Sequence, residues 1–102
     1  MEAIASRRRR KILRLVWDAE RSAGDIAAAF DISWPAVSQN LRVLKDTGLI
    51  QERRAGTHRY YRADQRALGP LEAVLRQMWT RDLGRLRDLA EQEARPRRPR
   101  HD

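Results

Sequence analysis

The side chains that most often carry catalysis or bind metals are scarce in this sequence. It contains no cysteine, which excludes disulfides, thiolate metal sites and a cysteine nucleophile. Its two histidines, His58 and His101, lie far apart in the sequence, and neither has a second ligand at helical spacing. No phosphate-binding glycine loop and no Ser/His/Asp set accompanies them. The sequence therefore gives little support to an enzyme, to a metal site or to a bound cofactor.

A different kind of chemistry, hydrogen bonding to an extended polar partner, is indicated by the segment that begins at Ser33. The outward positions of a helix there carry amides, hydroxyls and a guanidinium instead of the Glu/Lys pairs of a plain solvated face. Such groups can read the edges of DNA bases. The candidates are Ser33, Trp34, Ser38, Gln39, Asn40 and Arg42. Plain helix surface is the alternative for Ser38 and Gln39, and partly buried packing is an equal alternative for Trp34.

The charge of the chain favours a polyanionic partner. Lys and Arg outnumber Asp and Glu by 22 to 14, which gives a formal charge of +8 and a pI near 11.3. From Arg42 to Arg62 the chain carries six Lys or Arg residues against Asp46 and Glu52. Such a stripe can neutralise phosphates, and an ordinary charged hairpin is the alternative. The candidate phosphate contacts are Arg53, Arg54, Thr57, His58 and Arg59. Double-stranded DNA is the expected partner.

One domain must position these residues, because 102 residues with 41% apolar composition suffice for a single core. Ser6 is expected to cap a first helix that runs to about Asp18. Its buried side is expected to consist of Ile12, Leu13, Leu15 and Val16. Ser22 and Asp25 have capping-box spacing at the start of a short second helix. The apolar face of that helix is expected to consist of Ile26, Ala27 and Phe30.

A third helix and a hairpin are predicted next. Ser33 can cap this helix, its first turn tolerates Pro35, and Gly48 suits its end. Its inward positions are Val37, Leu41 and Leu44. Residues 49–54 and 58–62 then read as two strands around Ala55, Gly56 and Thr57. Tyr60 and Tyr61 must point to opposite faces, so one of them joins the core. Two short helices followed by a hairpin predict a winged helix-turn-helix, although a plain helical hairpin also fits the first part.

A long C-terminal helix is predicted over residues 70–93, with more apolar surface than one small domain can cover. A second copy of the chain is the simplest partner for it, so we expect a homodimer. The interface candidates are Leu71, Leu75, Met78, Trp79, Leu83 and Leu86. A ligand pocket lined by Met78 and Trp79 is the less favoured alternative. Residues 95–102 form a basic, proline-containing tail that we expect to be disordered, which leaves residues 1–94 as the DNA-binding and dimerisation domain.

Three stretches together resemble the ArsR/SmtB-type repressor family. SWPAVSQNLRVLKDTGLI at residues 33–50 is similar to its recognition helix, RRKIL at residues 9–13 to its basic first helix, and RRAGTHRYYR at residues 53–62 to its wing. The resemblance spans about residues 4–75. It implies a mainly α winged helix-turn-helix with a small β-hairpin, dimerisation through the terminal helices, and Trp34, Ser38 and Gln39 near the major groove. Trp34 departs from the polar residue usual there, and it could contact a thymine methyl or a sugar instead.

The resemblance also implies a repressor, and one recognition helix per subunit of a two-fold dimer predicts that its operator is an inverted repeat. Because the last helix lacks histidines, metal sensing of the family's usual kinds is not expected, and the effector stays unknown. A winged-helix adaptor that binds proteins without specific DNA binding is the alternative function. The early apolar run over residues 12–17 contains Arg14 and is followed by Asp18, too short and too charged for a signal peptide or a membrane span. We therefore expect a cytoplasmic protein with no membrane partner.

Overall fold

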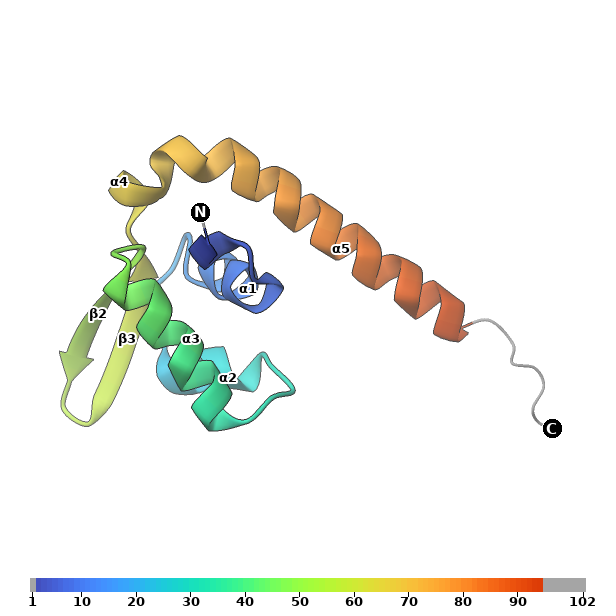
Figure 1. Ribbon diagram of the computed structural model, residues 1–102. Coiled ribbons are helices and arrows are strands. Elements are labelled where there is room, and N and C mark those ends of the chain that lie inside the picture. The colour runs from blue at the N-terminus through green and yellow to red at the C-terminus, as the bar shows by residue number, and fades with distance from the viewer. Residues whose placement is uncertain (1, 95–102) are drawn as a thin grey trace.

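A computed structural model describes the backbone of residues 2–94 and the side chains of residues 3–84. The elements follow in the order η1 (Glu2–Ile4), α1 (Arg7–Leu15), β1 (Arg21–Ser22), α2 (Ala23–Ala28), α3 (Trp34–Asp46), β2 (Ile50–Ala55), β3 (His58–Ala63), α4 (Gln65–Leu68), η2 (Gly69–Leu71) and α5 (Glu72–Ala94). The β2–β3 hairpin projects from one side of the helical body, and α5 extends past its opposite side (Figure 1). The predicted class, mainly α with a small β-hairpin, is confirmed.

The first helix begins where the sequence predicts and ends earlier. Ser6 caps α1, because its Oγ accepts a hydrogen bond from the Arg9 amide at 3.3 Å. The helix ends at Leu15 instead of Asp18. The carbonyl of Val16 instead accepts from the Ala63 amide at 2.9 Å, which ties the end of α1 to the sheet. Tertiary hydrogen bonding has therefore replaced the last predicted turn.

The second helix is capped as predicted. Ser22 accepts a hydrogen bond from the Asp25 amide at 3.0 Å, and Ile26 is fully buried. The helix ends at Ala28, so Phe30 lies beyond it, although the Phe30 ring still packs against the core. The short connection from Phe30 to Ser33 then turns the chain into α3.

The third helix matches its prediction at both ends. Ser33 accepts from the Ala36 amide at 3.3 Å, and the inward residues Val37, Leu41 and Leu44 are buried. At the other end the Leu49 amide donates to the Leu44 carbonyl at 2.9 Å, and the Gly48 amide donates to the Lys45 carbonyl at 3.0 Å. These two bonds form a Schellman motif, and the φ of +79° at Gly48 is the left-handed conformation that it requires.

The hairpin has one unpredicted neighbour strand. Ala55 pairs with His58, so only Gly56 and Thr57 form the turn, and Gly56 has a φ of +62°. The sheet order is β1-β3-β2, with the two-residue strand β1 antiparallel to β3. Of the two tyrosines, Tyr61 is buried and Tyr60 is half-buried.

The C-terminal helix starts two residues later than predicted. Asp64 first caps the short helix α4, which the sequence did not predict, and Pro70 lies in the η2 turn. Leu75 of α5 is fully buried, and only 7% of Trp79 is exposed, because both pack against the subunit's own core. The expected place of Leu75 and Trp79 in a dimer interface is therefore corrected. Their position follows from the way α5 crosses α1, which periodicity alone does not reveal.

Candidate nucleic-acid interface

The outer face of α3 carries most of the side chains proposed to read bases. Ser38, Gln39 and Arg42 are exposed, and Trp34 is 53% exposed at the first position of the helix. Ser33 is exposed as well, and its Oγ accepts the N-cap hydrogen bond, which holds this side chain against the end of the helix. Three hydrogen-bonding side chains and one indole therefore face outward together.

Asn40 does not share this face. Its Nδ2 donates to the Ala36 carbonyl at 2.8 Å, and its Oδ1 accepts from the Arg9 guanidinium at 3.5 Å. The side chain is half-buried between α3 and α1. The expected place of Asn40 among the outward residues is corrected, because its position on the helix turns it toward the neighbouring helix.

A groove of about 460 Å³ separates α3 from the wing, which is the β2–β3 hairpin. It brings residues of the predicted helix face together with residues of the predicted wing, which are distant in sequence. Its walls are formed by Ser22, Ala23, Gly24, Trp34, Ser38, Leu41, Thr57, His58, Arg59 and Tyr61. Sequence reasoning missed the contribution of the α2 N-terminus to this groove, since only the fold places it there.

The wing arginines differ in what they already bind. Both oxygens of Glu20 accept from Arg53, at 2.9 and 2.7 Å, and the Arg53 guanidinium lies 4.7 Å from the centre of the Tyr60 ring. The hydrogen bond from Arg53 lowers the pKa of Glu20. Arg54, in contrast, is exposed and makes no ion pair with any residue that the structure describes. No local sequence signal links Glu20 to Arg53, because they meet only across the sheet.

A second carboxylate, Glu52, lies where α3 meets the wing. It accepts a hydrogen bond from the Tyr61 hydroxyl at 2.8 Å and one from Lys45 at 3.2 Å, and it lies 3.9 Å from Arg59. The Tyr61 hydrogen bond, followed by those cations, lowers the pKa of Glu52. Burial above all raises the pKa of Tyr61, which keeps its hydroxyl a donor.

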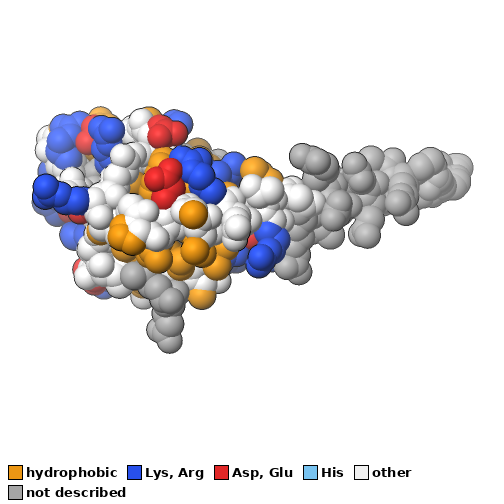
Figure 2. All heavy atoms as spheres, turned by 90° about the horizontal axis from the view of Figure 1, so that it is seen from above, with side chains coloured by type: hydrophobic (Ala, Val, Ile, Leu, Met, Phe, Trp, Pro, Cys, Tyr) orange, Lys and Arg blue, Asp and Glu red, His pale blue; other side chains and the backbone are white. Residues whose placement is uncertain are grey.

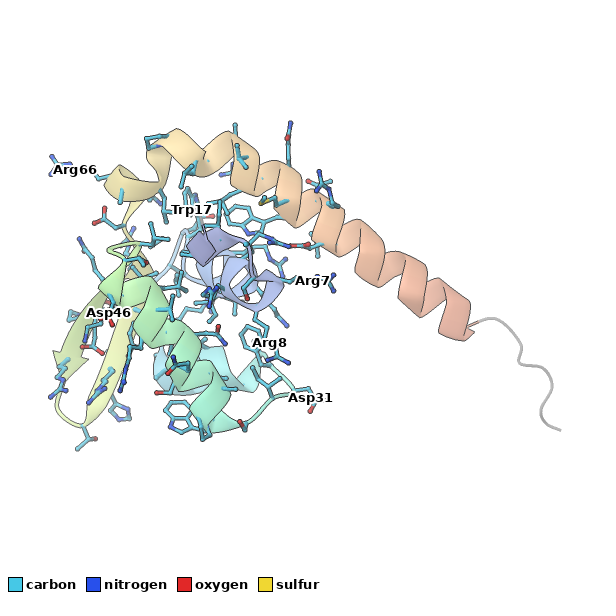
Figure 3. All side chains as sticks on the ribbon, in the orientation of Figure 1. Arg7, Arg8, Trp17, Asp31, Asp46 and Arg66 are labelled. Atoms are coloured by element: carbon cyan, nitrogen blue, oxygen red, sulfur yellow. The ribbon has the colours of Figure 1, made fainter. Side chains whose placement is uncertain are left out.

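The helices α1 and α5 are held together by an ion pair and by a nearby contact between two tryptophan rings. Arg10 of α1 donates to both oxygens of Asp82 of α5, at 2.9 and 3.0 Å, and this pairing lowers the pKa of Asp82. Trp79 Nε1 donates to the Arg10 carbonyl at 2.8 Å. Its ring meets Trp17 edge to face at 5.5 Å, and Trp17 lies between α1 and α5 in Figure 3.

The apolar residues that remain on the surface of α5 lie on its flanks. Val74 is 44% exposed and Leu83 is 43% exposed, whereas Met78 of α5 and Leu71 at the end of η2 are half-buried against the core. Seen from above, hydrophobic side chains gather over the start of α5, with Lys and Arg around them (Figure 2). The side chain of Leu86 and the tail over residues 95–102 lie outside the described residues.

Two properties of the described part of the chain bear on other functions. It contains no group of three or more His, Asp or Glu side chains placed to hold a metal ion. None of its helices is both long and apolar enough to cross a membrane.

The order of the elements, with α2 and α3 joined by a tight turn and followed by a two-stranded wing, defines a winged helix-turn-helix protein. The model of the arsR family of bacterial regulatory proteins matches residues 6–52. The chain belongs to the ArsR family, whose members are transcriptional regulators and not enzymes.

Named relatives give the same assignment. The chain is 39% identical to the HTH-type transcriptional regulator Rv2034 of Mycobacterium tuberculosis, over 80% of this chain and 77% of that protein. It is 43% identical to the transcriptional repressor SdpR of Bacillus subtilis, over 59% of this chain and 67% of that protein. A solved structure, the homodimeric winged helix-turn-helix DNA-binding domain of Mb0332 from Mycobacterium bovis, is 31% identical, with a TM-score of 0.63 over 99% of this chain and 82% of that chain.

Proposed function

We propose that this protein is a homodimeric transcriptional repressor that binds an inverted repeat in duplex DNA. The observation that carries the proposal is the groove between α3 and the wing. Trp34 and Ser38 line one side, and Thr57, His58 and Arg59 line the other. With α3 in the major groove, one DNA backbone would pass between these walls, and the wing would contact that backbone or the minor groove.

Base readout is assigned to Ser38, Gln39 and Arg42, which are exposed on α3 and point away from the core. Amide and guanidinium groups can make paired hydrogen bonds to adenine and guanine edges. Arg54 is assigned to phosphate contact, since it is exposed and makes no ion pair within the described residues. Asn40 and Arg53 receive lesser roles, because their side chains already bind Ala36 and Glu20.

The homodimer is supported by two independent points. The relative Mb0332 is described as homodimeric. In this chain α5 continues past the body that covers its first half, and Leu83 on its flank is 43% exposed. Two copies related by a two-fold axis would present two α3 helices to half-sites about one helical turn, or a multiple of it, apart.

The experiment that tests the proposal is selection of bound fragments from genomic DNA. An imperfect inverted repeat is expected, and asymmetric single sites or no enrichment would contradict it.

On the selected site, Gln39→Ala should relax base preference and cost about 1 to 3 kcal/mol of binding free energy, whereas Arg54→Ala should weaken binding to all sequences alike and flatten the salt dependence. Equal losses on specific and random DNA for Gln39→Ala would refute the base-readout assignment. If the affinity for a bound partner does not change with salt concentration, a protein-binding adaptor is favoured instead.

Dimer formation is tested by Leu83→Glu combined with Leu86→Glu, followed by light scattering and circular dichroism. Each leucine is worth about 1.5 to 3 kcal/mol when fully buried, so two charges there should oppose association by several kcal/mol. The body should stay folded, because the core residues Leu75 and Trp79 are unchanged. A double variant that remains dimeric and binds normally would place the interface elsewhere.

A further inference from the structure

Glu52 lies at the junction of three elements that the DNA interface needs. It belongs to β2, and its side chain is only 14% exposed. Oε1 accepts from Lys45 in the last turn of α3 at 3.2 Å, and Oε2 accepts from the Tyr61 hydroxyl of β3 at 2.8 Å. Arg59 of β3 approaches Oε2 at 3.9 Å. A single carboxylate therefore connects the proposed recognition helix with both strands of the wing.

The carboxylate and its cations differ in their access to solvent. Lys45 and Arg59 keep 48% and 52% of their side chains exposed, while Glu52 is mostly buried beneath them. The two cationic groups are thus at the surface, where a phosphate could reach them, and the anion is held in place by the buried Tyr61. A phosphate that approaches either cation must compete with Glu52 for it.

We propose that Glu52 is a specificity-determining residue of the DNA interface. It fixes the α3 end and the wing relative to each other, and it offsets part of the charge of Lys45 and Arg59 that any DNA sequence would attract. The inference rests on the proposed DNA-binding function. Phosphate contacts supply nearly all non-specific binding, whereas base contacts distinguish sequences. An anion beside these two surface cations weakens the attraction to phosphates in any duplex. On the operator, the fixed arrangement of α3 and the wing supports the base contacts and offsets this loss, so random DNA is weakened more.

The charge-neutral variant Glu52→Gln separates this role from a purely structural one. The glutamine amide oxygen can still accept from Tyr61, and the variant is nearly isosteric, so the fold should persist. Without the carboxylate charge, Lys45 and Arg59 should raise the affinity for random duplex about three- to ten-fold at low salt. The slope of the logarithm of the binding constant against the logarithm of the salt concentration should become steeper by about one to two. The ratio of operator to random affinity should fall. A merely structural role would lower affinity and leave the salt dependence unchanged.

The matched control is Asp46→Asn. Asp46 lies at the end of α3, close in sequence to Lys45, and it is exposed (Figure 3). It makes no ion pair with the described residues, so its substitution removes the same charge without freeing a cation. We expect the control to keep the wild-type salt dependence and the wild-type affinity ratio. An equal response of Asp46→Asn and Glu52→Gln would overturn the proposal, since it would reduce the effect to overall charge.

Binding is measured by fluorescence anisotropy with the selected operator and a random duplex over a series of salt concentrations. A wild-type protein that binds neither duplex would refute the proposed function itself. A wild-type protein that binds, with Glu52→Gln unchanged in salt dependence and ratio, would overturn only the role of Glu52. In a Lys45→Met, Arg59→Met background, Glu52→Gln should have no further effect on the salt dependence. A persistent effect there would refute action through these cations.

A second comparison does not depend on how Glu52→Gln folds. If Glu52 already offsets the charge of Lys45, then Lys45→Met should flatten the salt dependence less than Arg54→Ala, which removes a cation with no ion-pair partner among the described residues. Equal flattening by the two variants would overturn the proposal.

Discussion

Replacing Asp82 by asparagine tests the contact that fixes α5 on α1. The side chains of Arg10 and Asp82 are only 12% and 16% exposed, and two hydrogen bonds of 2.9 and 3.0 Å join them. Breaking a fully buried ion pair costs about 3–5 kcal/mol, and an exposed pair is worth about 0–1 kcal/mol. In the variant, Arg10 would still donate to the carbonyls of Ile4 and Ala5, so its charge would not be left without hydrogen bonds. We therefore expect Asp82→Asn to lower the free energy of unfolding by about 1.5–2.5 kcal/mol.

Thermal unfolding at one fixed protein concentration measures this loss, which corresponds to a fall in Tm of roughly 10 °C. The control is Glu72→Gln. Glu72 pairs with Arg76 on the same helix at 2.8 Å, but these side chains are 42% and 57% exposed, so the expected change is below about 0.5 kcal/mol. Equal losses in the two variants would refute the argument that burial decides the value of these pairs.

The same contact gives a pH dependence. Arg10 lowers the pKa of Asp82 in the folded state, so the folded protein binds this proton less readily than the unfolded chain does. Its stabilisation is complete above the unfolded pKa of about 4 and is lost as the pH falls through the lower folded value. The difference in stability between wild type and Asp82→Asn should therefore shrink as the pH falls below about 4. A constant difference down to pH 2 would contradict the assignment.

Two further predictions concern single residues in the same fold. Gly48→Ala should cost about 1–2 kcal/mol, because Gly48 has a φ of +79°, whereas Gly84→Ala in the helical α5 should stabilise by up to about 1 kcal/mol, since a Cβ there meets nothing within 4 Å. Urea unfolding of both variants checks the opposite signs, and equal signs would refute the backbone argument. Trp79→Phe should lose about 1–3 kcal/mol, because it removes the hydrogen bond to the Arg10 carbonyl, and an unchanged urea midpoint would show that this bond contributes nothing.

The parts of the fold that follow local rules could be predicted from the sequence. Ser6, Ser22 and Ser33 cap the helices predicted to follow them, and Gly48 ends α3 as expected. These signals depend on a few neighbouring residues and on backbone geometry. The burial of Val37, Leu41 and Leu44 could be predicted equally well, because helical periodicity alone specifies which side of α3 is apolar.

The incorrect assignments depend on contacts between elements. The two-residue strand β1 exists only because it pairs with β3, and nothing in Arg21–Ser22 itself predicts a strand. Asn40 looked like an outward polar residue because its partner Arg9 lies 31 positions away in the sequence. The stripe from Arg42 to Arg62 was predicted as a basic surface with Asp46 and Glu52 in it, but the sequence did not show that Glu20 and Glu52 pair with Arg53 and Arg59 after folding. Net charge therefore overstated the free positive charge of the site.

The correction to α5 changes how DNA binding and dimerisation are connected. If Leu75 and Trp79 were interface residues, losing the partner subunit would expose them; as core residues, they keep the first half of α5 fixed to α1 in each subunit. Arg10 is hydrogen-bonded to Asp82 and to Trp79, and the neighbouring Arg9 is hydrogen-bonded to Asn40 of α3. A short chain of contacts therefore runs from the recognition helix through α1 to α5. Under the proposed function, the distance between the two α3 helices of a dimer would be set by these contacts as much as by the interface, so Asp82→Asn should also weaken operator binding at protein concentrations where the dimer persists.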